Sequence, residues 1–357
     1  MRAIPMRWVL YICAALLIVI TIRRQVKDSV PIEAYQRWFS CKIIDTSQNT
    51  TDTSSSGTVG VTGSNRTANG SLTNPELNNQ TGEINNVTLY VTSNNIWHGR
   101  LGNQMFKYAS ILGISRKQGR KMFIEHNTDI EKTFKLKYVQ ANESVDKWST
   151  IKEANPFAFD PRMMSLRKEH TRIDGFLQAF VYFDNVVDEV RQEFTFHDYI
   201  ANDAAKILRN VYVNYNVTMT VGVHVRRGDF LSDFGKFWGY GVADKSYFTK
   251  AFSLLKSKFP KRKIIFLVAS DDLPWCQENL KRTDVFVLPE ASAAVHLAVL
   301  SSCDHVIISG GTFGWWAGWL ANGYVVYYTG HMGKGTRMGK MLIAYTYYPR
   351  LWIELGN

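Results

Sequence analysis

The sequence has few cysteines and lacks the short motifs that mark the common metal and phosphate sites. Its 357 residues include four cysteines, and no two of them form a Cys-x-x-Cys pair. A disulfide-scaffolded fold and a zinc or thiol redox site are therefore excluded. The chain also contains no Asp-x-Asp pair, no His-Glu-x-x-His motif and no P-loop. We therefore predict no metal site and no Walker-type phosphate site.

Basic residues outnumber acidic ones, but their distribution is not that of a nucleic-acid-binding protein. The formal net charge is +11, and no block of basic residues with interleaved aromatic residues occurs in the body of the chain. Five basic residues precede Asp28, the first acidic residue: Arg2, Arg7, Arg23, Arg24 and Lys27. This pattern favours anionic lipid near the N-terminus and a phosphate-bearing ligand elsewhere, and we expect no nucleic acid partner.

An uncharged apolar run near the N-terminus predicts a membrane anchor. Residues 8–22 have the sequence WVLYICAALLIVITI. The run is shorter than the ~20 residues of a typical span, which leaves a cleavable signal peptide as the alternative. It ends directly in Arg23 and Arg24 with no small-x-small cleavage site ahead of them. We therefore favour a single-pass signal-anchor at 8–22 behind a cytoplasmic tail at 1–7.

The segment that follows predicts a flexible, glycosylated stem at residues 23–88. From Cys41 to about Tyr90 it is rich in Ser, Thr, Asn and Gly and poor in aromatic residues, so it cannot bury a core. Asparagines of Asn-x-Ser/Thr acceptors lie in the stem and, twice, in the body: Asn49, Asn65, Asn69, Asn79, Asn86, Asn142 and Asn216. Glycan acceptors indicate a lumenal segment. A tail, an anchor, a stem and a lumenal body are typical of single-pass type II enzymes of the Golgi membrane.

A lumenal body makes disulfides possible. Cys13 lies in the apolar run, which leaves three cysteines. We expect Cys276 and Cys303 to pair, and Cys41 to stay free for a partner chain, as in a homodimer.

The body, from about Leu89, alternates strand and helix patterns. Residues 89–91 and 121–124 are predicted strands, separated by a glycine-rich turn at 99–104 and a helical run that ends near Gly119. In the second half the predicted strands are 219–223, 264–268, 285–288, 305–308 and 324–327, and the helices are 245–259, 291–303 and 315–322. Such alternation predicts an α/β fold with parallel sheets. We expect two Rossmann-like domains, 89–215 and 216–357, facing a cleft.

The stretch between the two alternating regions is rich in aromatic residues: Trp148, Phe157, Phe159, Phe176, Phe180, Tyr182 and Phe183. Aromatic faces stack well on sugar rings, but aromatic side chains more often pack in cores. We therefore expect packing here.

Three polar turns follow predicted strands of the second half, at 224–229, 270–272 and 309–314. Since the carboxyl ends of parallel strands share one edge of a sheet, the three turns are expected to converge on one ligand. A pair of arginines binds phosphate through charge-assisted hydrogen bonds, an acidic turn suits a ribose or base edge, and a Ser/Gly/Thr turn that opens a helix suits a second phosphate contact. Together the turns predict a nucleotide site.

Three segments carry a resemblance to a known family. They are GRLGNQMFKYA at 99–109, VGVHVRRGDF at 221–230 and SGGTFGWWAGWL at 309–320. In these segments the chain resembles the α1,2-fucosyltransferases, type II Golgi enzymes that use GDP-fucose. The central segment is also shared with α1,6- and protein O-fucosyltransferases. The resemblance spans essentially the whole body.

The resemblance implies a GT-B fold, with 89–215 as the acceptor-side domain and 216–357 as the GDP-fucose-binding domain. It also implies an inverting, metal-independent transfer of fucose from GDP-fucose to a galactose-terminated glycan. Arg226 would bind the β-phosphate and stabilise departing GDP, with His224 and Arg227 in support. Asp229 is the first candidate for the catalytic base, or it orients Arg226 instead. Further donor contacts would come from Asn103 toward the fucose or diphosphate, from Asp271 or Asp272 toward the guanine or ribose, and from Ser309, Gly311, Thr312 and Phe313 along the diphosphate.

Other functions stay open on the sequence alone. One is a fucosyltransferase for core GlcNAc or for protein Ser/Thr, and another is a catalytically silent glycan-binding membrane protein. The last alternative is adhesion through the integrin-type tripeptide Arg227-Gly228-Asp229. This tripeptide closely follows a predicted buried strand and is not expected at a loop tip.

Overall fold

The computed structural model describes residues 88–94, 99–124, 128–138 and 145–357, which belong to one compact unit, Asn86–Asn357. The predicted tail, anchor and stem lie outside the described residues, as do Asn142, Cys13 and Cys41. Within the part that is described, no helix has the length and apolar character needed to cross a membrane.

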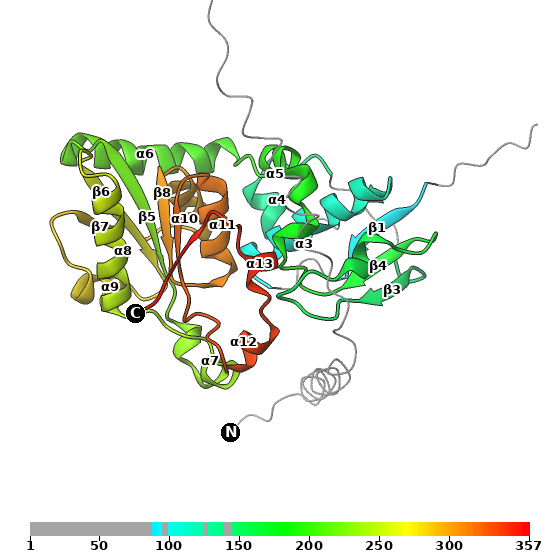
Figure 1. Cartoon of the computed structure of the whole chain (residues 1–357). Helices are drawn as coiled ribbons and strands as arrows, with labels where there is room; N and C mark the ends of the chain where they lie inside the picture. Colours follow the sequence, from blue (N-terminus) through cyan, green and yellow to red (C-terminus); the bar gives the residue numbers. More distant parts are fainter. Residues whose placement is uncertain (1–87, 95–98, 125–127, 139–144) are drawn as a thin grey trace, which may run out of the picture. The chain divides into compact units, whose positions relative to one another are not determined.

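A four-stranded parallel sheet forms the first half of the described chain (Figure 1). Its strand order is β2 (Lys121–Met122), β1 (Tyr90–Ser93), β4 (Thr171–Asp174), β3 (Ser149–Lys152). Helix α3 (Leu101–Lys117) connects β1 to β2, so the predicted strand–helix–strand unit is confirmed. The helix begins inside the stretch predicted as a turn. Nearly all of its residues from Leu101 to Ser115 are buried, as in a helix packed on every side.

A six-stranded parallel sheet forms the second half. Its strand order is β10 (Ile353–Leu355), β9 (Val325–Tyr328), β8 (His305–Ile308), β5 (Met219–Val225), β6 (Ile264–Ser270), β7 (Val285–Val287). The five strands predicted for this half are confirmed. Strand β5 continues two residues beyond its predicted end, because His224 and Val225 pair with Ala269 and Ser270 of β6.

The connecting helices of the larger sheet lie on both of its faces. They are α8 (Lys245–Lys258), α9 (Leu273–Asn279), α10 (Ala293–Ser301) and α11 (Gly311–Ala321). Asp244 caps α8, because its side chain accepts hydrogen bonds from the backbone of Ser246 and Tyr247. Helix α11 begins four residues before the predicted start, at Gly311.

Shorter elements complete the fold. They are α4 (Asp129–Thr133), η1 (Pro161–Met164), η2 (Phe180–Tyr182), η3 (Asp184–Val186), α5 (Val187–Glu193), α6 (Asp198–Tyr215), η4 (Asp229–Leu231), α7 (Asp233–Trp238), α12 (Arg337–Met341) and α13 (Ala344–Tyr347). The sequence analysis did not identify α6, an amphipathic helix that packs on α10.

The central strand β5 presents opposite faces to two different layers. Val221, Val223 and Val225 belong to a buried cluster with α8. Gly222 and His224 point the other way, since strand side chains alternate. On that face a Cβ at Gly222 would lie 3.1 Å from the Leu300 side chain, so glycine lets α10 approach the sheet closely.

The aromatic stretch packs largely as predicted. Tyr182 and Phe183 are buried, and the Phe183 ring stacks on Trp316 of α11 with 5.5 Å between ring centroids. Phe176 differs, because 39% of it is exposed.

Strands β1 to β4 lie within residues 89–215 and β5 to β10 within 216–357, yet both sheets contribute to one buried cluster. The division into two domains stays a prediction.

The expected Cys276–Cys303 disulfide is wrong, because both thiols are free and buried. Cys276 packs in the cluster on the α8 face of the larger sheet, and Cys303 packs in the cluster on the α10 face. The sheet therefore separates them. Burial raises the pKa of Cys276 to about 11 and that of Cys303 to about 12.

Thiol alkylation tests this assignment. At neutral pH neither thiol is expected to react in the folded protein, because both are buried and protonated. After unfolding without reductant, peptide mapping should show both Cys276 and Cys303 alkylated. A disulfide-linked peptide that joins the two would contradict the structure.

Candidate functional site

The three polar turns predicted to converge do meet at one edge of the larger sheet. They follow β5 and its two neighbours, β8 and β6, and all three strands are parallel. The backbone N–H of Arg226 donates to Ser309 Oγ at 2.8 Å, and the backbone N–H of Arg227 donates to Asp271 Oδ1 at 2.9 Å. The turn after β5 is therefore held from both sides by side chains of the neighbouring turns.

Arg226 lies at the centre of this group. Its guanidinium is 2.7 Å from Asp229 Oδ1 and 2.9 Å from Asp271 Oδ2, and 18% of its side chain is exposed. The Phe230 ring lies beneath it at 5.5 Å. A partly buried guanidinium with two carboxylate partners is fixed in direction, and such a group suits recognition of an anion.

Arg227 is also held firmly, but by different groups. Its Nε lies 3.0 Å from Asp272 Oδ2, and its guanidinium lies 4.0 Å from the centroid of the Trp275 ring. Only 15% of the side chain is exposed. The Arg227-Gly228-Asp229 tripeptide therefore does not present a free arginine, and the adhesion hypothesis has no support. Glycine at position 228 lets the backbone of this turn lie close to the Asp271 side chain, since a Cβ there would be 2.7 Å from Asp271 Oδ2.

The turn after β8 depends on two glycines and on a histidine that the sequence analysis did not identify. Gly310 has φ +146° and Gly311 has φ +77°, which favour glycine. The Gly311 N–H donates to Nε2 of His331 at 3.0 Å, so a neutral His331 carries its proton on Nδ1. The His331 ring, only 3% exposed, packs against the Phe230 and Tyr240 rings, which stack on each other with 4.3 Å between their centroids.

His224 lies in strand β5, beneath the site, and not in the turn as predicted. It is buried, forms a hydrogen bond with the Gly310 backbone, and its ring lies 5.2 Å from that of Phe313. Burial, with a further contribution from Arg226, lowers its pKa to about 3. Burial also lowers the pKa of His331 to about 3, with smaller contributions from His224 and Arg226. Both rings are therefore neutral at physiological pH.

The first turn of α3 reaches the same site from the other sheet. Asn103 Oδ1 accepts hydrogen bonds from Thr312 Oγ1 at 2.9 Å and from Gln178 Nε2 at 3.1 Å. A Cβ at Gly102 would lie 2.7 Å from the Phe313 backbone nitrogen, so this glycine permits close contact between α3 and α11. The structure thus brings Asn103 to Thr312, another residue of the predicted donor site, while its contact with the fucose or diphosphate stays a prediction. Gln178 carried no sequence signal.

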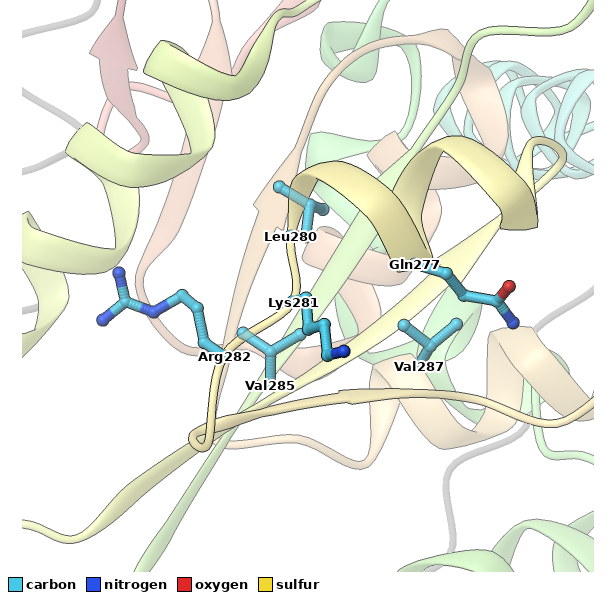
Figure 2. Close-up of a pocket in the computed structure, with 6 residues that line it drawn as sticks. All are labelled: Gln277, Leu280, Lys281, Arg282, Val285 and Val287. Atoms are coloured by element: carbon cyan, nitrogen blue, oxygen red, sulfur yellow. The ribbon is translucent and has the colours of Figure 1, made fainter.

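A surface hollow lies away from this group. Its volume is about 300 Å³, and it is lined by Gln277, Leu280, Lys281, Arg282, Val285 and Val287 of α9, β7 and the turn between them (Figure 2). None of the predicted site residues lines it. Among the residues that the structure describes, no group of three or more His, Cys, Asp or Glu side chains is placed to hold a metal ion. The metal independence of the reaction stays a prediction.

Comparison with known proteins identifies the family. Residues 77–333 match the model of glycosyl transferase family 11. The chain is 33% identical over 240 residues to galactoside alpha-(1,2)-fucosyltransferase 2 of Pongo pygmaeus, covering 64% of this chain and 69% of the relative. It is 32% identical over 274 residues to the Rattus norvegicus protein of the same name, covering 73% and 75%.

Among solved structures, the chain is similar to fucosyltransferase NodZ from Bradyrhizobium, with a TM-score of 0.42 and 16% identity, covering 64% of this chain and 92% of that one. The match to the family model extends over most of the chain. The chain belongs to glycosyl transferase family 11, and the protein is a glycosyltransferase.

The buried histidines predict a specific acid sensitivity of the fold. The folded pKa of His331 is about 3, below the ordinary value of 6.5. As pH falls below 6.5, the unfolded chain takes up a proton that the folded protein does not, so stability is lost between pH 6.5 and 3. The loss is about 1.4 kcal/mol per pH unit for this residue.

We expect His331→Gln to lose less stability than the wild type between pH 6.5 and 5, because glutamine can accept the Gly311 N–H without titrating. Denaturant unfolding at several pH values measures both slopes, and the comparison cancels the contribution of the carboxylates. Equal slopes would contradict a neutral His331 in the folded protein.

Proposed function

We propose that the protein is a galactoside α1,2-fucosyltransferase. It transfers L-fucose from GDP-β-L-fucose to the 2-hydroxyl of a terminal galactose on glycoprotein or glycolipid glycans, with inversion. The family membership, the names of the relatives at 32–33% identity and the three matching segments support this assignment. The two parallel sheets are compatible with a GT-B arrangement.

The observation that carries the proposal is the fixed direction of Arg226. Its guanidinium is held by Asp229 and Asp271 at the carboxyl edge of β5, next to the start of α11. Cleavage of the bond to fucose leaves negative charge on the GDP oxygens and positive charge on the sugar ring. A preorganised cation lowers the barrier because it faces the developing charge without having to reorient.

The turn after β8 supplies the second half of the phosphate site. The N-terminal backbone of α11 offers the N–H groups of Thr312 and Phe313 and the positive end of the helix dipole, while the Gly311 N–H is already donated to His331. His331 holds Gly311, and Ser309 holds the Arg226 backbone. Asn103 reaches Thr312 from the first half of the chain, where it can contact the diphosphate or the fucose.

The acidic residues have mainly positioning roles in this proposal. Asp272 accepts from the Trp275 backbone through Oδ1 and pairs with Arg227 through Oδ2. Both oxygens of Asp271 are engaged by Arg226 and by the Arg227 backbone. A ribose or guanine contact by Asp271 or Asp272 would use the remaining lone pairs of these oxygens or replace one of these bonds.

Asp229 has two candidate roles, base and orienting group. Its carboxylate lies 2.7 Å from the Arg226 guanidinium and 3.9 Å from that of Arg100. The short contact with Arg226 fixes the carboxylate and the guanidinium relative to each other. We therefore favour the orienting role. His224 is buried beneath the turn and supports Gly310.

We further propose that the protein is a single-pass type II membrane protein of the Golgi with its body in the lumen. The support is the apolar run, the basic flanks and the acceptor sites for glycans in the stem. A homodimer linked through Cys41 remains a hypothesis of the sequence.

Transfer of labelled fucose tests the proposal. The full-length protein in detergent is given GDP-fucose and EDTA with four acceptors: lactose, a type 1 disaccharide, a type 2 disaccharide and a biantennary N-glycan. We expect EDTA-resistant transfer to terminal galactose. Arg226→Ala should lower kcat/KM about 100-fold or more, because it removes a preorganised charge contact. Arg226→Lys should restore little, because lysine cannot form the two-pronged contact.

The matched control is Arg262→Ala, which changes an exposed arginine in the turn before β6. It should leave transfer unchanged. Transfer to core GlcNAc or to a protein hydroxyl would instead support another fucosyltransferase. Glycan binding without GDP binding or transfer would support the silent binding protein.

A further inference from the structure

One aromatic side chain of the smaller sheet is not accounted for by core packing. Phe176 lies in the loop 174–178, directly after β4, at the carboxyl edge of its sheet. Its exposed fraction is 39%, whereas Leu177, Gln178 and Ala179, which follow it, are buried. The loop therefore turns one large apolar ring outward while its neighbours are packed.

The loop is held rigidly in this conformation. Glu153 Oε2 accepts hydrogen bonds from the backbone N–H groups of Phe176 at 2.9 Å and Leu177 at 3.0 Å. Ser110 Oγ donates to the Leu177 carbonyl at 2.9 Å. A Cβ at Gly175 would overlap the Glu153 carboxylate, so glycine permits this approach. The exposure of Phe176 is thus built into the loop and is not the result of a loose chain.

The same loop holds a strained residue. Leu177 has φ +53°, a left-handed conformation that a leucine rarely adopts. Such conformations persist only where the surroundings fix them, and they are concentrated in loops that bind ligands.

Side-chain contacts connect the loop to the proposed donor site. Gln178 donates to Asn103, which accepts from Thr312 at the start of α11. Lys107 lies one helical turn beyond Asn103 on α3, and its Nζ is 5.5 Å from the centroid of the Phe176 ring. Phe176 therefore lies beside the face of α3 that leads, through Asn103, to Thr312.

We propose that the loop 174–178 is the acceptor subsite, with the Phe176 ring packed against the apolar face of the terminal galactose and the Asp174 carboxylate accepting hydrogen bonds from its hydroxyl groups. This inference rests on the proposed function. Galactose presents a patch of C–H groups on one face, and these pack well on an aromatic ring, whose face is electron-rich. Asp174 is partly exposed and lies 3.8 Å from Lys152, a surface contact that a sugar hydroxyl can replace.

The test compares Phe176→Ala and Phe176→Trp with Tyr212→Ala in the full-length protein. Tyr212 is a matched control, because it is 44% exposed and lies on α6, away from the loop. We expect Phe176→Ala to raise the KM for lactose about tenfold, as expected for the loss of one stacking contact, and to leave the KM for GDP-fucose within about twofold. Phe176→Trp should restore most of the acceptor affinity.

Saturation-transfer NMR with lactose and GDP provides a readout that does not need turnover. The galactose ring protons should receive saturation in the wild type and in Tyr212→Ala, and lose it in Phe176→Ala. An unchanged KM and an unchanged NMR signal in Phe176→Ala, with GDP binding intact, would overturn the subsite. Galactoside binding that depends on Phe176, without any transfer by the wild type, would support the subsite and contradict the proposed function.

Discussion

The site depends on the pairing of β5 with β8 on one side and β6 on the other. This pairing places three turns side by side, so that Ser309 and Asp271 each accept a backbone N–H from the turn after β5. The Arg226 guanidinium then has one available direction, between Asp229 and Asp271. A cation fixed by neighbours in this way costs little reorganisation when an anion arrives, and this is the property that transfer of a sugar from a nucleotide requires.

The second constraint is that the backbone of the turn after β8 lies close to the His331 ring. Gly310 and Gly311 adopt positive φ, and the ring of His331 fills the space beside them and accepts the Gly311 N–H. His224 supports the same turn from within the sheet. Both rings are neutral because they are buried beside Arg226. They therefore support the turn through packing and hydrogen bonds and add no positive charge to it. The proposed phosphate site thus carries its positive charge on Arg226 and at the N-terminus of α11.

Five of the six strands of the larger sheet and the convergence of its three turns were predictable, because they follow from local patterns: β-branched runs such as 219–223 and the polar residues that end them. The features that were missed depend on contacts between distant segments. His331 meets Gly311 across twenty positions, and Gln178 meets Asn103 across seventy-five. The prediction of a Cys276–Cys303 disulfide was wrong for the same reason, since only the completed sheet shows that the two thiols lie on opposite faces.

The carboxyl edge of β5, β6 and β8 is the proposed binding site for the diphosphate of the donor. A crystal structure of the protein with GDP tests it most directly. We expect the β-phosphate within hydrogen-bonding distance of the Arg226 guanidinium and of the backbone N–H groups of Thr312 and Phe313, with Arg226 released from at least one of its carboxylate partners. GDP bound elsewhere, for example in the hollow beside α9 and β7, with Arg226 still held by Asp229 and Asp271, would contradict it.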